Sequence, residues 1–121
     1  MDERPRDLTD SELSVFRRLL KWNFPGRDAL RLQLEGLKVR QLDESGCLAL
    51  EPTAKVPAHV EHRIPIEGSF PDSDGVLTHV DLHVVDGLLF GLEYYKEDGS
   101  AVVRHPPAES IELFSPTGES D

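Results

Sequence analysis

The chain has 121 residues, of which 38% are hydrophobic, and this suits one modest globular core rather than a disordered segment. No run approaches the roughly 18 apolar residues of a membrane-spanning helix, and the charged first ten residues do not resemble a secretory signal. The formal net charge of −10 argues against nucleic-acid binding, because phosphate contacts need clustered Lys and Arg. We therefore expect a cytoplasmic protein, and the single cysteine, Cys47, agrees with a reducing compartment.

The charge is distributed unevenly along the chain. Residues 1–40 hold nine Lys or Arg against seven Asp or Glu, whereas residues 41–121 hold four against sixteen. An acidic surface keeps a protein soluble, and it also attracts a basic partner and speeds the encounter. The second part of the chain is therefore expected to form either a well-hydrated acidic surface or one that binds a basic protein.

The N-terminal part predicts two helices. Residues 1–8 are expected to be disordered, and a helix begins at Thr9, because Thr9 and Glu12 have the spacing of a capping box. Apolar residues recur on one side of this helix at Leu13, Phe16, Leu19 and Leu20. A second helix is expected from Pro25 to Glu35, since proline suits a first helical turn. The alternation of Leu30, Leu32 and Leu34 also fits a strand.

A hairpin and then a longer meander are expected to follow. Residues 37–42 and 47–51 flank an Asp/Gly turn, and Cys47 is expected to lie buried and inert in the second strand. Residues 60–104 hold three strongly alternating segments and a weak fourth, 101–104, separated by further Asp/Gly turns. Pro65 indicates an edge or a bulge in the first of these strands, because proline cannot donate a ladder hydrogen bond.

Two loop lengths determine the predicted register of the meander. A three-residue loop ending at Gly87 pairs Val84 with Leu88, and a five-residue loop ending at Gly75 pairs Phe70 with Val76. A two-residue loop before Leu88 would set the histidines of one strand beside the leucines of the next. Because one face is buried, we prefer the longer loop.

These elements predict an α+β fold. Two N-terminal helices pack on one face of an antiparallel meander sheet of about five or six strands, in a single domain spanning residues 9–114. Residues 110–114 form a last strand, and residues 115–121 form a mobile acidic tail. One helix layer covers one sheet face, so the other face meets water or a partner.

The predicted register assigns neighbours on that outer face. His79 lies between Glu67 and Glu93, Asp81 between Pro65 and Gly91, His83 between Arg63 and Leu89, and Leu77 beside Tyr95. Interfaces combine apolar anchors with a polar rim, so this face is our leading candidate for protein binding. The predicted partner-binding residues are Glu67, Leu77, His79, Asp81, His83, Leu89, Glu93 and Tyr95.

Two other uses of the outer face stay open. His79, Asp81 and His83 offer imidazole and carboxylate ligands for zinc or non-haem iron, and so a metal-dependent enzyme is the alternative function. Alternate residues on a strand lie roughly 6.6 Å apart, however, so three such ligands converge only on a curved sheet. A homodimer through the sheet edge or this face is also possible. No nucleophile or phosphate-binding loop is visible, and we predict no cofactor and lean towards a protein that is not an enzyme.

A resemblance adds to this interpretation. The turn Asp72-Ser-Asp74-Gly75-Val76 precedes a segment, Val80–Tyr95, with an Asp-Gly turn and a Leu-Phe-Gly-Leu-Glu strand. This pattern resembles small acidic bacterial proteins of unknown function, some of them similar to immunity proteins of polymorphic toxin systems. The resemblance covers roughly residues 9–100. It implies a cytoplasmic bacterial protein that binds a toxin or another basic partner, and it implies no catalytic residue.

Overall fold

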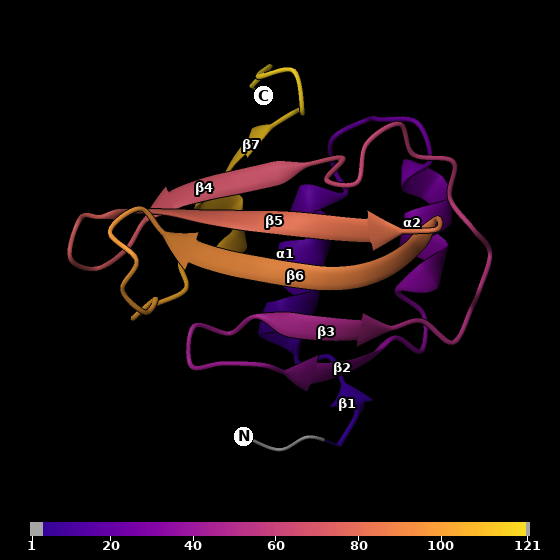
Figure 1. The fold of residues 1–121 in the computed structure, drawn as a ribbon, viewed down its shortest axis with the longest axis horizontal. Helices are drawn as coiled ribbons and strands as arrows, with labels where there is room; N and C mark the ends of the chain where they lie inside the picture. The colour runs from indigo at the N-terminus through magenta and orange to yellow at the C-terminus, as the bar shows by residue number, and fades with distance from the viewer. Residues whose placement is uncertain (1–3, 121) are drawn as a thin grey trace.

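The structure is a computed structural model that describes residues 4–120, and one antiparallel sheet runs through it. The strands lie in the order β1-β2-β3-β6-β5-β4-β7, with the helices behind them (Figure 1). Their bounds are β1 Arg6–Asp7, β2 Lys38–Gln41, β3 Leu48–Glu51, β4 Glu67–Pro71, β5 Leu77–Val85, β6 Leu88–Lys96 and β7 Glu112–Phe114. The predicted α+β fold is confirmed, although the sheet of seven strands is larger than expected.

Both helices precede the main part of the sheet, as predicted. Helix α1 (Asp10–Leu19) begins with the expected capping box: Glu12 N–H donates to Thr9 Oγ1 over 3.1 Å, and Thr9 N–H donates to Glu12 Oε1 over 2.9 Å. The second segment is the helix α2 (Arg27–Gln33) and not a strand. Of the described residues, neither helix is long and apolar enough to cross a membrane.

The core lies between the helices and one face of the sheet. Phe16 and Leu19 of α1 and Leu30 of α2 are fully buried, as are Val80 and Leu82 of β5. In Figure 1 both helices lie behind the sheet, and no described helix or strand covers the front face of β4, β5 and β6. That front face carries the odd-numbered side chains of β5, which the sequence had assigned to the outer surface.

The hairpin between β5 and β6 differs from the predicted one. Val85 pairs with Leu88 across a two-residue Asp86-Gly87 turn, and both turn residues have positive φ. A β-bulge then shifts the register between His83 and Val84, so that Leu82 lies opposite Leu92. The predicted three-residue loop was therefore wrong. A two-residue turn alone would have put the wrong side of β6 into the core, but the bulge adds a residue and restores the burial pattern.

The bulge exchanges the positions of two neighbouring side chains. Leu89, predicted to lie on the outer face, is 1% exposed and belongs to the core, whereas Phe90, predicted to be buried, is 56% exposed. Leu89 is therefore not a partner-binding residue, and this part of the site prediction was wrong. The guanidinium of Arg63 lies 5.5 Å from the centre of the Phe90 ring and covers part of it.

The hairpin between β4 and β5 is shifted by two residues from the prediction. Pro71 pairs with Leu77 and Glu67 with Asp81, whereas the predicted loop would have paired Phe70 with Val76. A shift by two leaves every side chain on its predicted face but changes its cross-strand neighbour. Strand β4 is also not an edge, because β7 pairs with its other side, and Pro65 precedes the strand.

The remaining differences lie near the ends of the chain. Arg6 and Asp7 pair with β2, so disorder up to residue 8 does not hold for these two residues, and residues 1–3 lie outside the described part. Residues 101–104 form no strand. Beyond β7, Ser115 N–H donates to Glu119 O over 2.8 Å, forming a turn, and the mobility of residues 115–121 stays a prediction.

Candidate functional site on the open face of the sheet

Three carboxylates form one row across neighbouring strands of the open face. Glu67 of β4 pairs with Asp81 of β5, and Asp81 pairs with Glu93 of β6. Paired residues in an antiparallel sheet project from the same face with Cβ atoms about 4.5–5.5 Å apart. Like charges placed directly opposite each other destabilise a sheet, so this row costs stability unless a proton or a cation neutralises part of it.

Asp81 stands at the centre of the row. It is 5% exposed although the face around it is open, and its Oδ1 accepts no hydrogen bond from any described residue. Burial, together with the neighbouring charges of Glu67 and Glu93, raises the pKa of this carboxyl to about 6. The group is thus held partly protonated near neutral pH, at the boundary between a neutral acid and a carboxylate.

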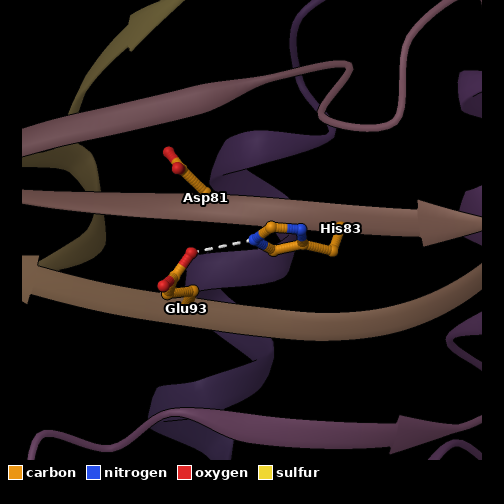
Figure 2. Close-up of side chains that lie close together, drawn as sticks. All are labelled: Asp81, His83 and Glu93. Atoms are coloured by element: carbon orange, nitrogen blue, oxygen red, sulfur yellow. Dashed lines mark hydrogen bonds and ion pairs between the residues drawn. The ribbon is translucent and has the colours of Figure 1, made fainter.

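His83 brings a nitrogen ligand to the same row. Its Nε2 lies 2.9 Å from Glu93 Oε1, and Figure 2 shows the imidazole and the carboxylate pointing towards each other from β5 and β6. One ligand atom from each of Asp81, His83 and Glu93 lies within 4.8 Å of the other two. We call these three residues together with Glu67 the acidic–histidine cluster.

His79 lies outside this cluster. Its Nε2 is 3.0 Å from Glu97 Oε1, and its ring stacks on Tyr95 with a centroid distance of 4.9 Å. It pairs with Ser69 and Tyr95, whereas the sequence had placed it between Glu67 and Glu93. The reason is that β4 and β6 each lie two residues away from their predicted register against β5. Glu93, and not His79, is therefore the third residue beside Asp81 and His83.

Two of the predicted apolar anchors are on the open face. Leu77 is 39% exposed and Tyr95 is 41% exposed, and both lie at the end of the hairpin opposite the bulge. They are not the direct pair that the sequence predicted, because Leu77 pairs with Pro71 and Tyr95 with His79. Exposed Phe90 near the bulge is an apolar residue that the alternation pattern had assigned to the core.

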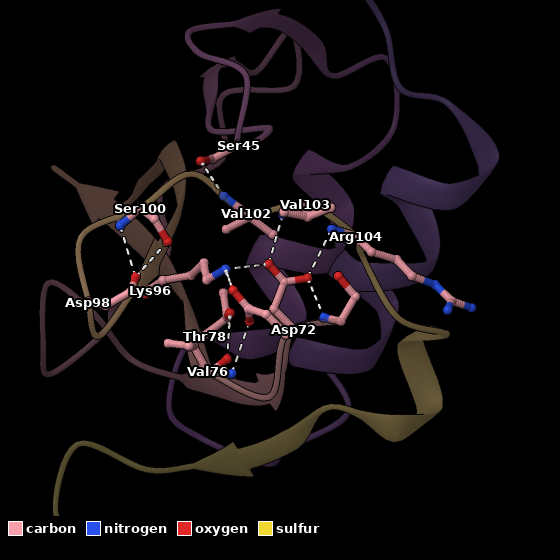
Figure 3. A network of polar contacts seen from close by, with 12 residues as sticks. Ser45, Asp72, Val76, Thr78, Lys96, Asp98, Ser100, Val102, Val103 and Arg104 are labelled. Carbon is pink, nitrogen blue, oxygen red and sulfur yellow. Dashed lines mark hydrogen bonds and ion pairs between the residues drawn. The ribbon is translucent and has the colours of Figure 1, made fainter.

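A second ionic group, on the helix side of the sheet, was missed by the sequence analysis. Lys96 is buried, and its Nζ lies 2.9 Å from Asp72 Oδ2 and 2.6 Å from Asp74 Oδ2 (Figure 3). Hydrogen bonds from the Val103 and Arg104 amides hold the pKa of Asp72 well below its usual range, with Lys96 adding to the effect. The sequence did indicate that Lys96 faces inwards, because it continues the alternating series of Leu92 and Tyr94 on the buried side of β6.

This network explains why residues 101–104 form no strand. The amides of Val103 and Arg104 donate to the Asp72 carboxylate, and the Val102 amide donates to Ser45 Oγ over 2.9 Å. Side-chain acceptors thus satisfy the backbone groups that a strand would have paired. Lys96 pairs with both Asp72 and Asp74, and amides of the chain bind the Asp72 carboxylate, so we interpret this group as structural.

A groove between α1 and residues 101–108 holds further ionisable groups. Its His105 stacks on Tyr94 with a centroid distance of 4.2 Å, and His105 Nε2 lies 2.8 Å from Ser45 O. Its Glu12 is held by Arg6 and by the capping box. These groups already hold the chain together, so the acidic–histidine cluster is the stronger functional candidate.

Cys47 is structural, as expected. Its thiol lies in the core, donates to Tyr94 O over 3.3 Å and accepts from Tyr94 N–H over 3.2 Å. Burial raises the pKa of the thiol to about 11, so the reactive thiolate is scarce at neutral pH.

Fold and site together define a small α+β protein with helices on one sheet face and ionisable groups on the other. The chain belongs to the family DUF6984, a domain of unknown function whose model matches residues 5–106. That match includes the whole acidic–histidine cluster and ends before β7. No curated protein and no solved structure gives a significant match.

Proposed function

We propose that the chain is a protein-binding module without enzymatic activity, which docks a basic protein on the open face of its sheet. The observation that carries the proposal is the composition of that face. Exposed Leu77 and Tyr95 lie beside the carboxylates of Glu93 and Glu97, with no described helix in front of them. Aromatic and aliphatic anchors within a charged rim are typical of specific interfaces.

Charge complementarity points to a basic partner. The acidic carboxylates of β4, β5 and β6 on this face belong to a chain with a net charge of −10. Long-range attraction would guide a cationic surface to the face, and this contribution weakens as salt shortens the screening length. Such a partner would also relieve the repulsion within the row of carboxylates.

The resemblance to immunity proteins supports the same proposal from another direction. An immunity-like role would be to neutralise a basic partner by covering its surface, and such pairs meet in the cytoplasm, which is the compartment we propose for this chain. A second copy of the chain is a weaker candidate for the occupant, because two acidic faces repel each other at low salt.

A pull-down with paired variants tests the proposal. The full chain is immobilised and exposed to a lysate of the cells that encode it, and the recovered protein is expressed and titrated at about 50 and 300 mM salt. Tyr95→Ser combined with Glu97→Lys removes one anchor and reverses one charge on the open face. We expect at least a tenfold loss of affinity, and weaker binding of the wild-type chain at high salt.

The matched control makes the same changes on the opposite side of the molecule. Leu32 and Glu35 are exposed at α2, behind the sheet, so Leu32→Ser with Glu35→Lys should leave affinity within about twofold. Equal losses from both double variants, or affinity that does not respond to salt, would contradict docking on the open face. Neither variant alters the acidic–histidine cluster.

A further inference from the structure

The acidic–histidine cluster has a feature that a docking surface does not need. Three carboxylates and one imidazole lie on adjacent strands, and the central carboxylate, Asp81, is almost fully buried with an oxygen, Oδ1, that accepts no hydrogen bond from the described residues. A buried carboxylate oxygen without a partner is costly, and such groups are normally paired or coordinate a cation. The exposed edge of the cluster leaves access from solvent.

We infer that Asp81, His83 and Glu93 bind one divalent transition-metal cation, with Glu67 as a third carboxylate beside them. The ligand set of carboxylate oxygens and one imidazole nitrogen suits Zn²⁺ and its neighbours better than the all-oxygen cations. The inference does not rest on the proposed docking function, because it concerns a different ligand, although both use carboxylates of the open face.

The present geometry is close to what coordination requires. The three ligand atoms lie within 4.8 Å of one another, whereas ligands about 2.0–2.2 Å from one ion lie at most about 4.4 Å apart. His83 Nε2 and Glu93 Oε1 already lie 2.9 Å apart, so the remaining adjustment concerns the distance between this pair and the Asp81 carboxylate. An ion would take the place of the proton between these two side chains.

The local backbone explains how strand ligands converge. The β-bulge adds one residue to β6 next to Gly91, and Gly91 is the cross-strand partner of His83. A bulge bends and twists its strand, and Figure 2 shows the His83 ring turned towards Glu93. The three ligands thus come from two neighbouring strands, β5 and β6, and not from one strand alone.

Calorimetry with ZnCl₂ on the full chain, stripped of metal with chelator, tests the inference. We expect one ion per chain, and at least a tenfold loss of affinity for Asp81→Asn. Glu97→Gln removes one charge from the same face without touching the cluster, and His59→Gln removes an exposed histidine elsewhere. Both controls should bind Zn²⁺ within about twofold of the wild-type chain. Absence of binding, or equal binding by Asp81→Asn, would overturn the inference.

A second measurement locates the ion without any substitution. Substoichiometric Mn²⁺ added to the ¹⁵N-labelled chain should broaden the amide signals of Asp81, Gly91 and Glu93 first. Signals from His59 and Gly99 should broaden only at higher Mn²⁺ concentration. If the signals around Asp72 and Asp74 broadened first, or all acidic segments broadened together, the cation would not be held by the cluster.

Discussion

A buried acid beside two other acids makes Asp81 the residue whose environment is least favourable in the absence of a cation. Its folded pKa of about 6 lies above the ordinary value of 3.8. Well below pH 3.8 the group is protonated in both the folded and the unfolded chain, so no penalty applies. Between pH 3.8 and about 6 the unfolded chain has released this proton while the folded chain keeps it, so stability falls as the pH rises, and the loss is complete above about pH 6.

We therefore predict that Asp81→Asn stabilises the metal-free chain at pH 7.5. A pKa displaced from 3.8 to about 6 corresponds to about 3 kcal/mol, and we expect about 1–2 kcal/mol because solvent relaxes around the cluster. Urea unfolding in the presence of chelator at pH 4 and 7.5 measures the effect. The gain should be much smaller at pH 4, and a variant equally stabilised at both values would show that ionisation is not the cause.

Asp72 should show the opposite dependence on pH. Its folded pKa is lowered, so its stabilising contribution is present above about pH 4 and is lost as the pH falls below the ordinary value of 3.8. We predict that Asp72→Asn is destabilised at pH 7 and that its deficit relative to wild type shrinks between pH 4 and 2. Thermal unfolding across this range checks the prediction, and a deficit that stayed constant would contradict it.

At the scale of the elements, one glutamine joins α2 to the β5–β6 turn. Buried Gln33 donates to Val56 O over 2.8 Å and to Gly87 O over 2.9 Å, and accepts from Leu89 N–H over 2.8 Å. Gln33→Leu removes all three hydrogen bonds and leaves their backbone groups without this partner. We expect a loss of about 3 kcal/mol in the free energy of unfolding. Gln41→Leu, at a half-buried site with one hydrogen bond to Asp43 O, should cost well under half as much.

The two hairpin turns offer a second comparison. Gly75 and Gly87 both have positive φ, but a Cβ on Gly87 would lie 2.7 Å from Ala58 O, whereas a Cβ on Gly75 would meet nothing within 4 Å. We predict that Gly75→Ala costs about 1 kcal/mol, from the left-handed conformation alone. Gly87→Ala should cost about 3 kcal/mol or more, since the Ala58 backbone must move as well. Similar costs in chemical denaturation would contradict this packing.

The hairpins show that the sequence predicts the face on which a side chain lies but not its cross-strand neighbour. A two-residue turn with a bulge at Phe90 buries the same side of β5 as a three-residue turn does, so hydrophobic alternation cannot distinguish them. Likewise, a slip of two residues between β4 and β5 leaves all faces unchanged. The pattern therefore predicts which side chains share a face, as it did for Asp81 and His83.

The chemistry of the site depends on neighbours, which the pattern does not determine. The predicted register placed Asp81 between Pro65 and Gly91, and in that setting it would have been an unremarkable exposed acid. In the structure it lies between Glu67 and Glu93, and the cluster arises from that placement. The lengths of the two turns and the bulge set this register, and the alternation pattern determines none of them.

At the scale of the whole molecule, the C-terminal segment completes the sheet although it lies beyond the residues that the family model matches. Strand β7 pairs with β4, and Ile111 and Leu113 are both 1% exposed in the core. Arg18 of α1 donates to Ile111 O through Nε and Nη2 over 3.0 and 2.8 Å, which joins the helix layer to this segment. Without the segment, β4 would present an unpaired edge.

We accordingly predict that a chain ending at Pro106 loses its cooperative fold, even though it holds the whole matched region. Leu113→Ala alone should cost about 3 kcal/mol, since it leaves a cavity in the core, whereas Glu112→Ala on the exposed side of the same strand should cost under about 0.5 kcal/mol. Urea unfolding followed by circular dichroism measures all three chains, with light scattering to detect association through β4. A shortened chain that unfolded cooperatively with near wild-type stability would show that the sheet is complete without β7.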